Sequence, residues 1–447
     1  MERQRIGRQA VVIGAGIGGL GAARAAADVF ERVIVLDRDR FPIDPAPRDG
    51  TPQARHVHAL LAGGQDALEA LFPGLTEDIT AAGAVPQRVG LDLRVERPGF
   101  DPFPRRDLGW QSLCLSRPLL EHLVRRRVST LPGVELRQGW RVTGLLTDAA
   151  GTSVAGVRAE ADDGHDAILP ADLVIDASGR GEPTLALLAS TGAPPPPTET
   201  IGVDIGYATA VFDIPAERAD DWLGVMTLPG PGNARGAVML PIEGGRWMLT
   251  LVGRHDDPPP GEWGALLAYA RGLRTRTVAD AVEGARKHGG VVRYRFPDSL
   301  RRRFERVAAF PRGLLPIGDA ICRFNPFYGQ GMSVAAQQAR ALARLLAEST
   351  GRADPLSDLA VRFFAEAQAL IDTPWFGAAI PDFTHPQTRG ERPADLAARL
   401  RYGGVVAALA AEDPAVHDLM LRVTHLRAPY TALREHALAA RVAARMH

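Results

Sequence analysis

A glycine pattern near the N-terminus, Gly14-x-Gly16-x-x-Gly19, constrains the fold of this chain more than any other feature. It follows an apolar run at residues 10–13, which suits a buried parallel strand, and it opens the Ala-rich stretch 17–28, which favours a helix. Gly14 permits a tight strand-to-helix turn, Gly16 lets the backbone approach a pyrophosphate, and Gly19 lets the helix pack closely on the strand. The pattern therefore predicts a site for an adenine dinucleotide.

A second apolar run, residues 33–36, completes a βαβ unit and ends at Asp37. Asp37 lies 18 residues past Gly19, where a carboxylate accepts hydrogen bonds from the ribose hydroxyls of adenosine. A signal peptide or a short membrane span is the alternative interpretation of this apolar segment. The glycines and Arg24 argue against both, and no other stretch approaches the roughly 20 apolar residues of a span. We therefore expect a cytoplasmic protein with no membrane span.

The charge balance restricts the class of partner. Lysine plus arginine and aspartate plus glutamate both total 52, which gives a formal net charge of zero. This balance argues against nucleic acid or an acidic membrane surface as the main partner. The two cysteines, Cys114 and Cys322, lie far apart and neither belongs to a C-x-x-C pair, so we expect no metal site.

The middle of the chain predicts a second sheet. After the proline stretch 194–197, residues 200–213, 223–228, 235–242 and 246–252 have the composition of strands separated by turns. This predicts an antiparallel sheet and a second domain. Helices are predicted at 64–72, 117–130, 261–272, 276–285, 330–349 and 354–371, and the tail after Pro374 is expected to be mainly helical.

Two further motifs follow predicted strands. Gly318-Asp319 comes after the apolar run 314–317 and continues into Asn325-Pro326-x-x-Gly329-Gln330-Gly331-Met332 and a helix. Asp319 can bind a polyol hydroxyl, and a helix N-terminus at Gly331 would stabilise negative charge on a reduced flavin ring. An ordinary loop with a helix cap explains this segment equally well. The second motif is a strand ending at Asp176, followed by Ala-Ser-Gly-Arg, for which a simple strand-exit turn is the alternative.

Together these motifs resemble the group A flavoprotein monooxygenases, which have the p-hydroxybenzoate hydroxylase fold. The resemblance covers nearly the whole chain. The variant Gln53-x-Arg55-His56-x-His58, with Asn325-Pro-Phe-Tyr-Gly-Gln-Gly-Met332 and Asp372-Thr-Pro374-Trp375, is similar to a bacterial secondary-metabolism branch. That branch includes the olefin epoxidases of polyether antibiotic pathways and the flavoprotein cyclases of spirotetronate and spirotetramate pathways.

The resemblance implies an FAD site and assigns roles to residues along the chain. The ADP half would be held by Gly14, Gly16, Gly19 and Asp37, and the ribityl hydroxyls by Asp319. Arg117 would contact the diphosphate or the ribityl chain, Asp176 of the middle motif would be a further cofactor-binding residue, and Gly331 and Met332 would present backbone N–H groups to the flavin ring. Pro326 would line the ring face where oxygen reacts. We take Pro326, Arg55 and His58 as the candidate catalytic residues; Arg55, His56 and His58 could equally form a loop in which one histidine caps a helix.

The expected function is an FAD-dependent monooxygenase with NADPH or NADH as electron donor and O2 as co-substrate. Reduced flavin would form a flavin hydroperoxide and pass one oxygen atom to an alkene of an apolar, polyketide-type substrate, giving an epoxide. The alternatives are a non-redox cyclase that keeps FAD as a structural element, an aromatic hydroxylase, and a reductase of isoprenoid double bonds. The expected fold is α/β, with a three-layer Rossmann-like FAD domain (1–86, 112–190 and 296–372), an antiparallel-sheet substrate domain (87–111 and 191–295) and a helical C-terminal region (373–447).

Overall fold

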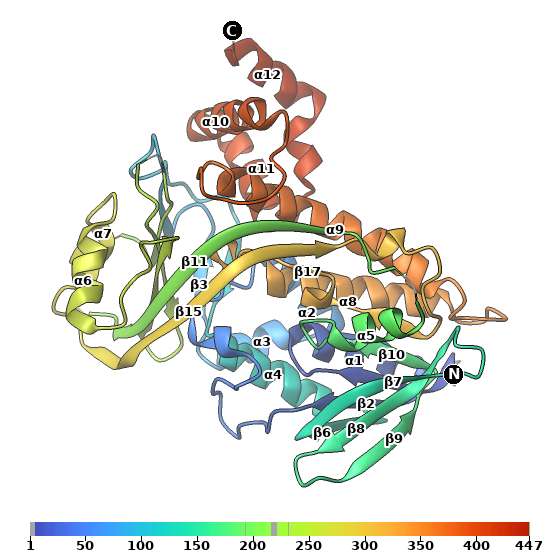
Figure 1. Cartoon of the computed structure of the whole chain (residues 1–447). Helices are drawn as coiled ribbons and strands as arrows, with labels where there is room; N and C mark the ends of the chain where they lie inside the picture. The colour runs from blue at the N-terminus through green and yellow to red at the C-terminus, as the bar shows by residue number, and fades with distance from the viewer. Residues whose placement is uncertain (1–4, 193, 216–220, 231, 447) are drawn as a thin grey trace.

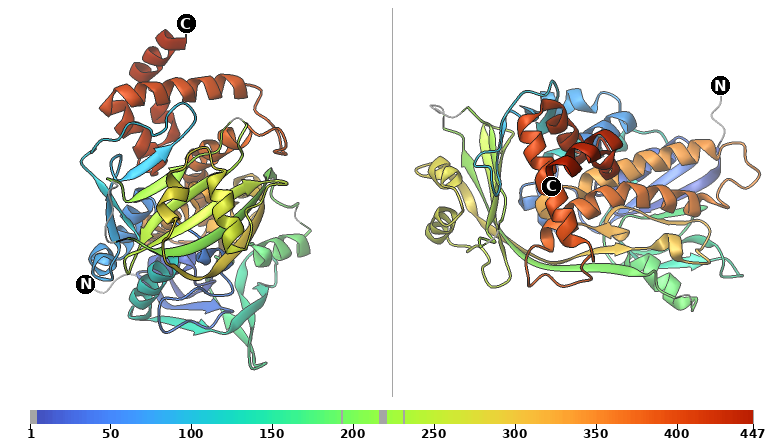
Figure 2. Two further views of the ribbon diagram at one scale, coloured as in Figure 1. Left: turned by 90° about the vertical axis from the view of Figure 1, so that its left-hand side faces the viewer. Right: turned by 90° about the horizontal axis from the view of Figure 1, so that it is seen from above.

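Two large sheets form the framework of the molecule. The computed structural model describes residues 5–192, 194–215, 221–230 and 232–446. Figure 1 shows the parallel sheet on the side of the N-terminus, and the second sheet on the other side next to two short helices, α6 (Trp263–Arg271) and α7 (Thr277–Val282). Seen from above in Figure 2, the C-terminal helices lie over the junction between these two parts. The predicted α/β fold class is confirmed.

The parallel sheet has five strands and forms the middle of three layers. Its core strands carry continuous apolar runs because both faces are covered. Val12 packs toward helices on one face, whereas Val11 packs toward a small three-stranded antiparallel sheet on the other. The strand order is β16 (Leu314–Pro316), β10 (Leu173–Asp176), β1 (Gly7–Ile13), β2 (Phe30–Asp37) and β6 (Val134–Gln138), and the small sheet contains β7 (Trp140–Thr147), β8 (Val154–Ala161) and β9 (Asp166–Pro170).

Glycines allow the helical layer to pack tightly. A Cβ added at Gly21 would lie 2.7 Å from the Cβ of Ala339, so this glycine lets two helices approach each other closely. The two helices are α1 (Ile17–Ala27) and α8 (Gly331–Glu348), and the predicted bounds of both are correct to within a residue. The helices α2 (Ala62–Leu71) and α4 (Arg117–Ser129) pack near them, and α3 (Leu75–Ala81) packs on α2 and α4, whereas α5 (Glu182–Ser190) packs on β7 of the small sheet.

The second sheet contains seven strands and is mainly antiparallel. The predicted strands are all present, but a long strand that the sequence did not predict lies beside the first of them. This strand contains Gly289, Gly290 and Pro297, residues that weaken strand propensity, and its pairing shifts register where they occur. The order is β17 (Cys322–Arg323), β15 (Lys287–Arg302), β11 (Thr198–Asp213), β14 (Arg246–Arg254), β13 (Gly236–Ile242), β12 (Gly224–Thr227) and β4 (Leu93–Glu96).

The long paired strands β11 and β15 connect the two parts of the molecule. In Figure 1 both arch from the side of α5 to the side of α6 and α7. β4 comes from a distant segment and pairs in parallel with β12 at the far edge of the sheet. A separate antiparallel pair, β3 (Val85–Arg88) and β5 (Gln111–Cys114), precedes α4 in the chain.

The C-terminal third departs from the prediction at one helix. The expected helix end at residue 371 is wrong, because α9 (Leu359–Asp382) continues through Pro374 and Pro381. A proline removes one helical hydrogen bond, but burial of Ile371 and Trp375 holds the segment in the core and compensates for that loss. Three helices complete the chain: α10 (Leu396–Glu412), α11 (Pro414–Thr424) and α12 (His436–Met446).

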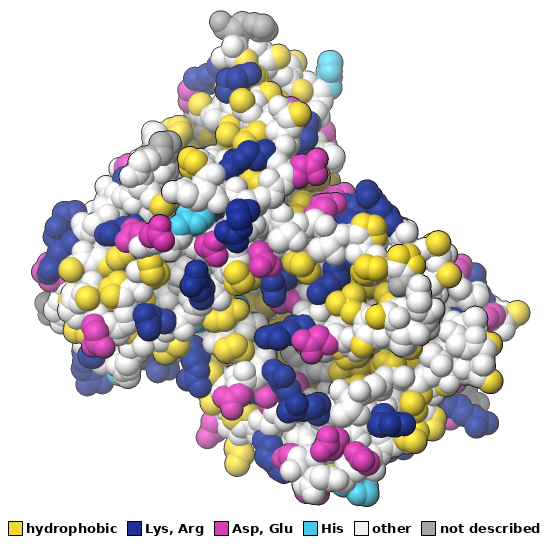
Figure 3. Space-filling model, viewed as in Figure 1, with side chains coloured by type: hydrophobic (Ala, Val, Ile, Leu, Met, Phe, Trp, Pro, Cys, Tyr) yellow, Lys and Arg dark blue, Asp and Glu magenta, His cyan; other side chains and the backbone are white. Residues whose placement is uncertain are grey.

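The surface carries charges of both signs. On the face drawn in Figure 3, acidic and basic side chains are intermingled, which agrees with the equal totals of 52 for the two signs. Among the described residues, none of the helices combines the length and the apolar character needed to cross a membrane.

Candidate cofactor and substrate site

The three glycines of the N-terminal pattern, called here the fingerprint glycines, are Gly14, Gly16 and Gly19. They have different surroundings in the turn from β1 to α1. Gly14 has a φ of +98°, and a Cβ there would lie 2.6 Å from the carbonyl oxygen of Ala177. A Cβ at Gly19 would lie 1.9 Å from the carbonyl oxygen of Gly14. A Cβ at Gly16 would meet nothing within 4 Å. Packing therefore requires glycine at two positions, whereas the third faces open space at a helix N-terminus, where a phosphate group fits.

Asp37 ends β2 beside this turn and is almost fully buried. Its Oδ2 accepts a hydrogen bond from the Ala15 N–H at 2.7 Å, and its Oδ1 lies 3.2 Å from Nη1 of Arg48. The buried Arg48 guanidinium also forms ion pairs with Asp39 and Glu121. Burial opposes the charge on Arg48, but the three carboxylates outweigh it and raise its pKa. The sequence prediction missed Arg48, which lies in a proline-rich loop with no motif of its own.

Arg117 is held in place at the start of α4. Ser116 caps this helix, because its side chain accepts a hydrogen bond from the Leu119 N–H. Arg117 donates from Nε to Oε1 of Glu121 at 2.8 Å, and its Nη1 lies 3.3 Å from Nε2 of His58. This pair was not predicted from the sequence, although the i, i+4 spacing of Arg117 and Glu121 is a signal from which it could have been found.

The tautomer of His58 follows from its two neighbours. Its Nδ1 lies 2.9 Å from the carbonyl oxygen of His56, which can only accept, so Nδ1 carries the proton. Nε2 therefore has a lone pair that accepts a hydrogen bond from Arg117. Burial, followed by the charge of Arg117, lowers the pKa of His58 to about 3. A neutral His58 thus orients the Arg117 guanidinium.

The two predicted aspartates of the downstream motifs lie in different surroundings. Asp176 is fully buried, and its Oδ2 accepts hydrogen bonds from the backbone N–H and the hydroxyl of Thr184 at 3.2 and 2.6 Å. It therefore stabilises the start of α5. Asp319 is partly buried beyond β16, and within the described part of the chain it has no hydrogen-bond partner. Burial raises the pKa of Asp319, against the effect of Arg117 and Arg323.

These residues fit FAD. An open backbone turn suits its pyrophosphate, and an unpartnered carboxylate at Asp319 suits the hydroxyls of its ribityl chain. Gly331 and Met332 begin α8 next to Asp319, where the helix N-terminus favours negative charge. The described residues contain no group of three or more metal-ligating side chains close enough to hold a metal ion.

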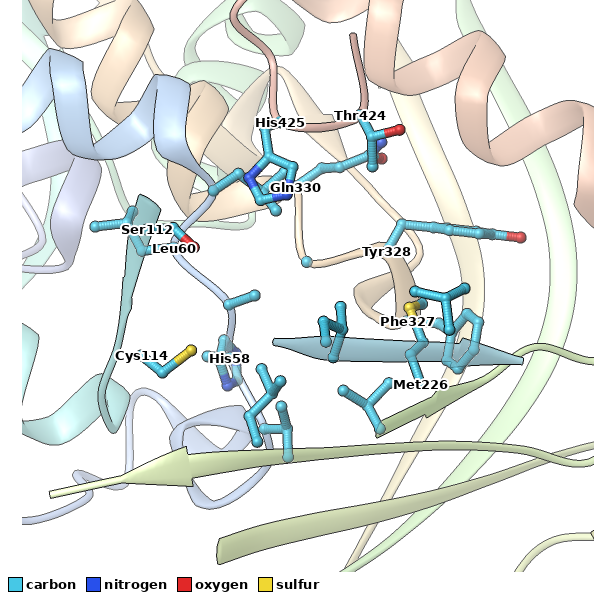
Figure 4. Close-up of a pocket in the computed structure, with 18 of the residues that line it drawn as sticks. His58, Leu60, Ser112, Cys114, Met226, Phe327, Tyr328, Gln330, Thr424 and His425 are labelled. Atoms are coloured by element: carbon cyan, nitrogen blue, oxygen red, sulfur yellow. The ribbon is translucent and has the colours of Figure 1, made fainter. Parts of the chain in front are cut away.

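A cavity of about 420 Å³ lies between the seven-stranded sheet, the loop before α8 and the helix α11. Figure 4 shows its wall, with His58, Cys114 and Met226 on one side and Gln330, Thr424 and His425 on the other. The predicted residues Pro326 and His58 both line it. Arg55 is exposed at the end of a short 3-10 turn, outside the cavity wall. The sequence prediction also missed the contribution of α11, since its residues carry no motif.

His56 lies in the cavity wall. The residue is 4% exposed, and its Nδ1 lies 2.7 Å from Oγ1 of Thr209, which lies 2.6 Å from Oγ1 of Thr250. Its Nε2 is buried and has no partner among the described residues. The ring lies beside Tyr207 and Tyr294, and burial lowers its pKa to about 4. His56 is therefore a neutral ring with one unused nitrogen.

The loop before α8 is anchored to the end of α9. The side-chain oxygen of Asn325 accepts a hydrogen bond from the Phe327 N–H at 3.1 Å and so caps the turn that begins at Pro326. Its Nδ2 lies 3.0 Å from both carboxylate oxygens of Asp382. The hydroxyl of Tyr328 donates to the same carboxylate at 3.2 Å. Through these bonds Asp382 fixes the shape of the segment that carries Pro326.

The chain matches a protein family and a curated relative. The FAD binding domain family matches residues 8–357. Protein Rv3254 of Mycobacterium tuberculosis (strain ATCC 25618 / H37Rv) is 36% identical over 357 residues, which cover 75% of this chain and 72% of that protein.

Two solved structures show a similar fold. The flavin-dependent brominase Bmp2 has a TM-score of 0.68 and 16% identity, with 98% of each chain covered. PqsL, a probable FAD-dependent monooxygenase from Pseudomonas aeruginosa, has a TM-score of 0.60 and 18% identity, and the match covers 84% of this chain and 97% of PqsL. At these identities the similarity concerns the fold alone.

Proposed function

Because this chain belongs to the FAD binding domain family and is an FAD-dependent oxidoreductase, we propose that it is a monooxygenase that epoxidises an alkene. The proposed substrate is a mainly apolar, polyketide-type secondary metabolite, and NADPH or NADH is the proposed electron donor. In this proposal the FAD domain comprises 1–86, 112–190 and 296–372, the substrate domain comprises 87–111 and 191–295, and residues 373–447 form the helical C-terminal region.

The observation that carries the proposal is the composition of the cavity beside the loop that contains Pro326. Most side chains in its wall are apolar, including Leu228, Leu240 and Val252. Such a wall binds an apolar skeleton and excludes water, which protects reactive intermediates from hydrolysis. The lining histidines His56 and His58 are neutral, so they add polarity without a charge.

The chain's own residues would hold the cofactor and position the substrate. When bound, FAD supplies the redox chemistry with O2. The turn at Gly14–Gly19 would hold its pyrophosphate, and Arg117, kept in place by Glu121 and His58, would contact its diphosphate or ribityl chain. The segment from Pro326 to Gly329 would form the wall between the ring and the substrate.

An isotope experiment tests the proposal. The FAD-loaded protein, NADPH and ¹⁸O2 are incubated with polyene and aromatic candidates, and products are analysed by mass spectrometry. Incorporation of one ¹⁸O atom into an alkene supports the proposal. Failure to add oxygen to any candidate contradicts it. Bromide in a parallel reaction tests for halogenation, the type of reaction named for the structural relative Bmp2.

A second measurement separates redox from structural use of the cofactor. The FAD-loaded protein is mixed with NADPH without oxygen, and the flavin absorbance is followed with and without substrate candidates. Bleaching supports an oxidoreductase that accepts electrons from NADPH. A flavin that is never reduced favours the non-redox cyclase, and reduction followed by alkene saturation without O2 favours a reductase.

Aromatic hydroxylation is a second candidate, favoured by the unused Nε2 of His56. This nitrogen accepts a hydrogen bond when Nδ1 donates to Thr209, and donates one when Thr209 donates to Nδ1. In either state it can bind a phenolic hydroxyl. Its low pKa of about 4 makes it a weak base, so it would orient the phenol rather than deprotonate it. Comparing turnover of a phenol with that of its methyl ether, in wild type and His56→Leu, tests this candidate.

A further inference from the structure

One arginine in the cavity wall has no carboxylate partner among the residues that the structure describes. Arg97 lines the cavity, and its nearest aromatic contact is the ring of Phe103, with Cζ 5.8 Å from the ring centroid. Within the part of the chain that the structure describes, its side chain forms no ion pair. Arg105, a neighbour in the wall, differs because its guanidinium is paired with Asp221 at 2.6 Å.

The direction of the Arg97 side chain follows from its strand. Side chains alternate between the two faces of a strand, so Leu93, Val95 and Arg97 point to one side. All three line the cavity, whereas Arg94 and Glu96 do not. Arg97 lies just past the end of β4, where a backbone bridge to Phe100 continues the extended chain. The guanidinium therefore belongs to the cavity face.

The acidic side chains nearest in sequence are already engaged elsewhere. Glu96 is fully buried on the opposite face and accepts hydrogen bonds from Arg94 and from three threonine hydroxyls. Asp101 is paired with Arg274, and Asp92 with Arg88. No carboxylate of this segment remains to neutralise Arg97.

A second unpartnered group lies in the same part of the wall. His417 of α11 lines the cavity, is 3% exposed, and has a buried Nδ1 with no partner among the described residues. Its ring packs edge-on against Phe103 with a centroid distance of 5.1 Å, so Phe103 contacts both His417 and Arg97. Arg97 and His417 thus form a polar part of the cavity wall around Phe103.

We propose that Arg97 binds an oxyanion of the substrate, a carboxylate or a phosphate ester, while the apolar skeleton fills the rest of the cavity. Arg97 is partly buried and has no ion-pair partner among the described residues, and a ligand oxyanion would supply one through two parallel hydrogen bonds. The substrate class is then an amphipathic acid. This inference refines the proposed function and rests on it for the identification of the cavity as a substrate site.

Binding of paired probes tests the proposal without turnover. Dodecanoate, dodecyl phosphate and 1-dodecanol are titrated into the FAD-loaded protein by calorimetry. One charge-assisted interaction contributes about 1.5–3 kcal/mol, so we expect an anionic probe to bind about 10- to 100-fold more tightly than the alcohol. Whichever anionic probe binds more tightly identifies the head group. Arg97→Met should abolish the preference, and Arg97→Lys should retain part of it.

Two controls separate oxyanion binding by Arg97 from a purely structural role of this residue. Arg276→Met removes an exposed arginine paired with Asp280 in the same domain and should leave the preference for the acid intact. Arg97→Met should also unfold at no lower urea concentration than wild type, because the substitution breaks no ion pair of the described residues and replaces a partly buried charge with an apolar side chain.

Two outcomes would overturn the proposal. One is equal affinity of the wild-type protein for the anionic probes and the alcohol; the other is an anion preference that survives in Arg97→Met. Because no NADPH is present, the result is independent of catalysis. A retained anion preference together with no oxygen incorporation would refute the proposed monooxygenase and leave the oxyanion site standing.

Discussion

The Arg254 guanidinium donates a hydrogen bond from Nη2 to Oδ1 of Asp382 at 2.7 Å, and both side chains are almost fully buried. Arg254 ends β14 in the large sheet, and Asp382 ends α9. The same carboxylate holds Asn325 and Tyr328. One ion pair therefore ties the sheet, the C-terminal helix and the loop beside the cavity to each other.

Replacing Asp382 should destabilise the protein strongly. Asp382→Ala leaves Arg254 buried without its partner, and breaking such a pair costs about 3–5 kcal/mol. Urea unfolding followed by circular dichroism measures this loss. Asp395→Asn, which removes an exposed i, i+4 pair with Arg399, is the control and should leave the unfolding midpoint unchanged. An unchanged midpoint in Asp382→Ala would show that the ion pair does not hold the loop.

The fingerprint glycines should respond differently to alanine. Gly19→Ala places a Cβ against the Gly14 carbonyl and should destabilise the apoprotein by about 1–3 kcal/mol. Gly16 has an extended backbone and open space, so Gly16→Ala should leave apoprotein unfolding unchanged. The added methyl group would instead occupy the approach to the pyrophosphate and weaken FAD binding by about tenfold, or 1.4 kcal/mol. Fluorescence titration with FAD measures the second effect; unaltered FAD affinity in Gly16→Ala would place the cofactor elsewhere.

The elements that the sequence predicted well are those with local signals. The turn at Gly14–Gly19 combines an apolar run, spaced glycines and an Ala-rich helix, and the bounds of α1 and α8 agree closely with prediction. β15 was missed because its glycines and arginines do not resemble a strand, and its stability comes from pairing along β11. α9 was predicted to stop before Pro374, but tertiary packing outweighs the proline.

Residues of the candidate site could be predicted only where they belong to a recognisable motif. Pro326 and His58 belong to such motifs, and both line the cavity. Arg97 and Asp382 carry no motif, and their importance depends on which charges surround them after folding. An unpaired arginine cannot be distinguished from a paired one in the sequence, because its partners come from distant segments.

The buried histidine His56 should make stability depend on pH. Its pKa is lowered from 6.5 to about 4, mainly by burial, so between these values the unfolded chain binds more protons than the folded one. Stability therefore rises with pH across this window and is lost as pH falls from 6.5 to 4, by up to roughly 3 kcal/mol. Below pH 4 this contribution no longer changes. Urea unfolding from pH 4 to 8 should show a shallower dependence in His56→Leu, with the exposed His436→Leu as control; identical profiles for His56→Leu and wild type would contradict the prediction.

The contact between His58 and Arg117 leads to a prediction for FAD affinity. His58 offers Arg117 only a lone pair, because its Nδ1 proton is used by the His56 carbonyl oxygen. His58→Gln provides an oxygen acceptor in its place and should preserve FAD binding, whereas His58→Leu frees the guanidinium and should weaken binding by about tenfold, the effect of one interaction of 1.4 kcal/mol. Quenching of FAD fluorescence gives both dissociation constants. Equal affinities of the two variants would show that His58 does not act through Arg117, and equal weakening with a lowered urea midpoint would instead indicate damage to the loop that carries His58.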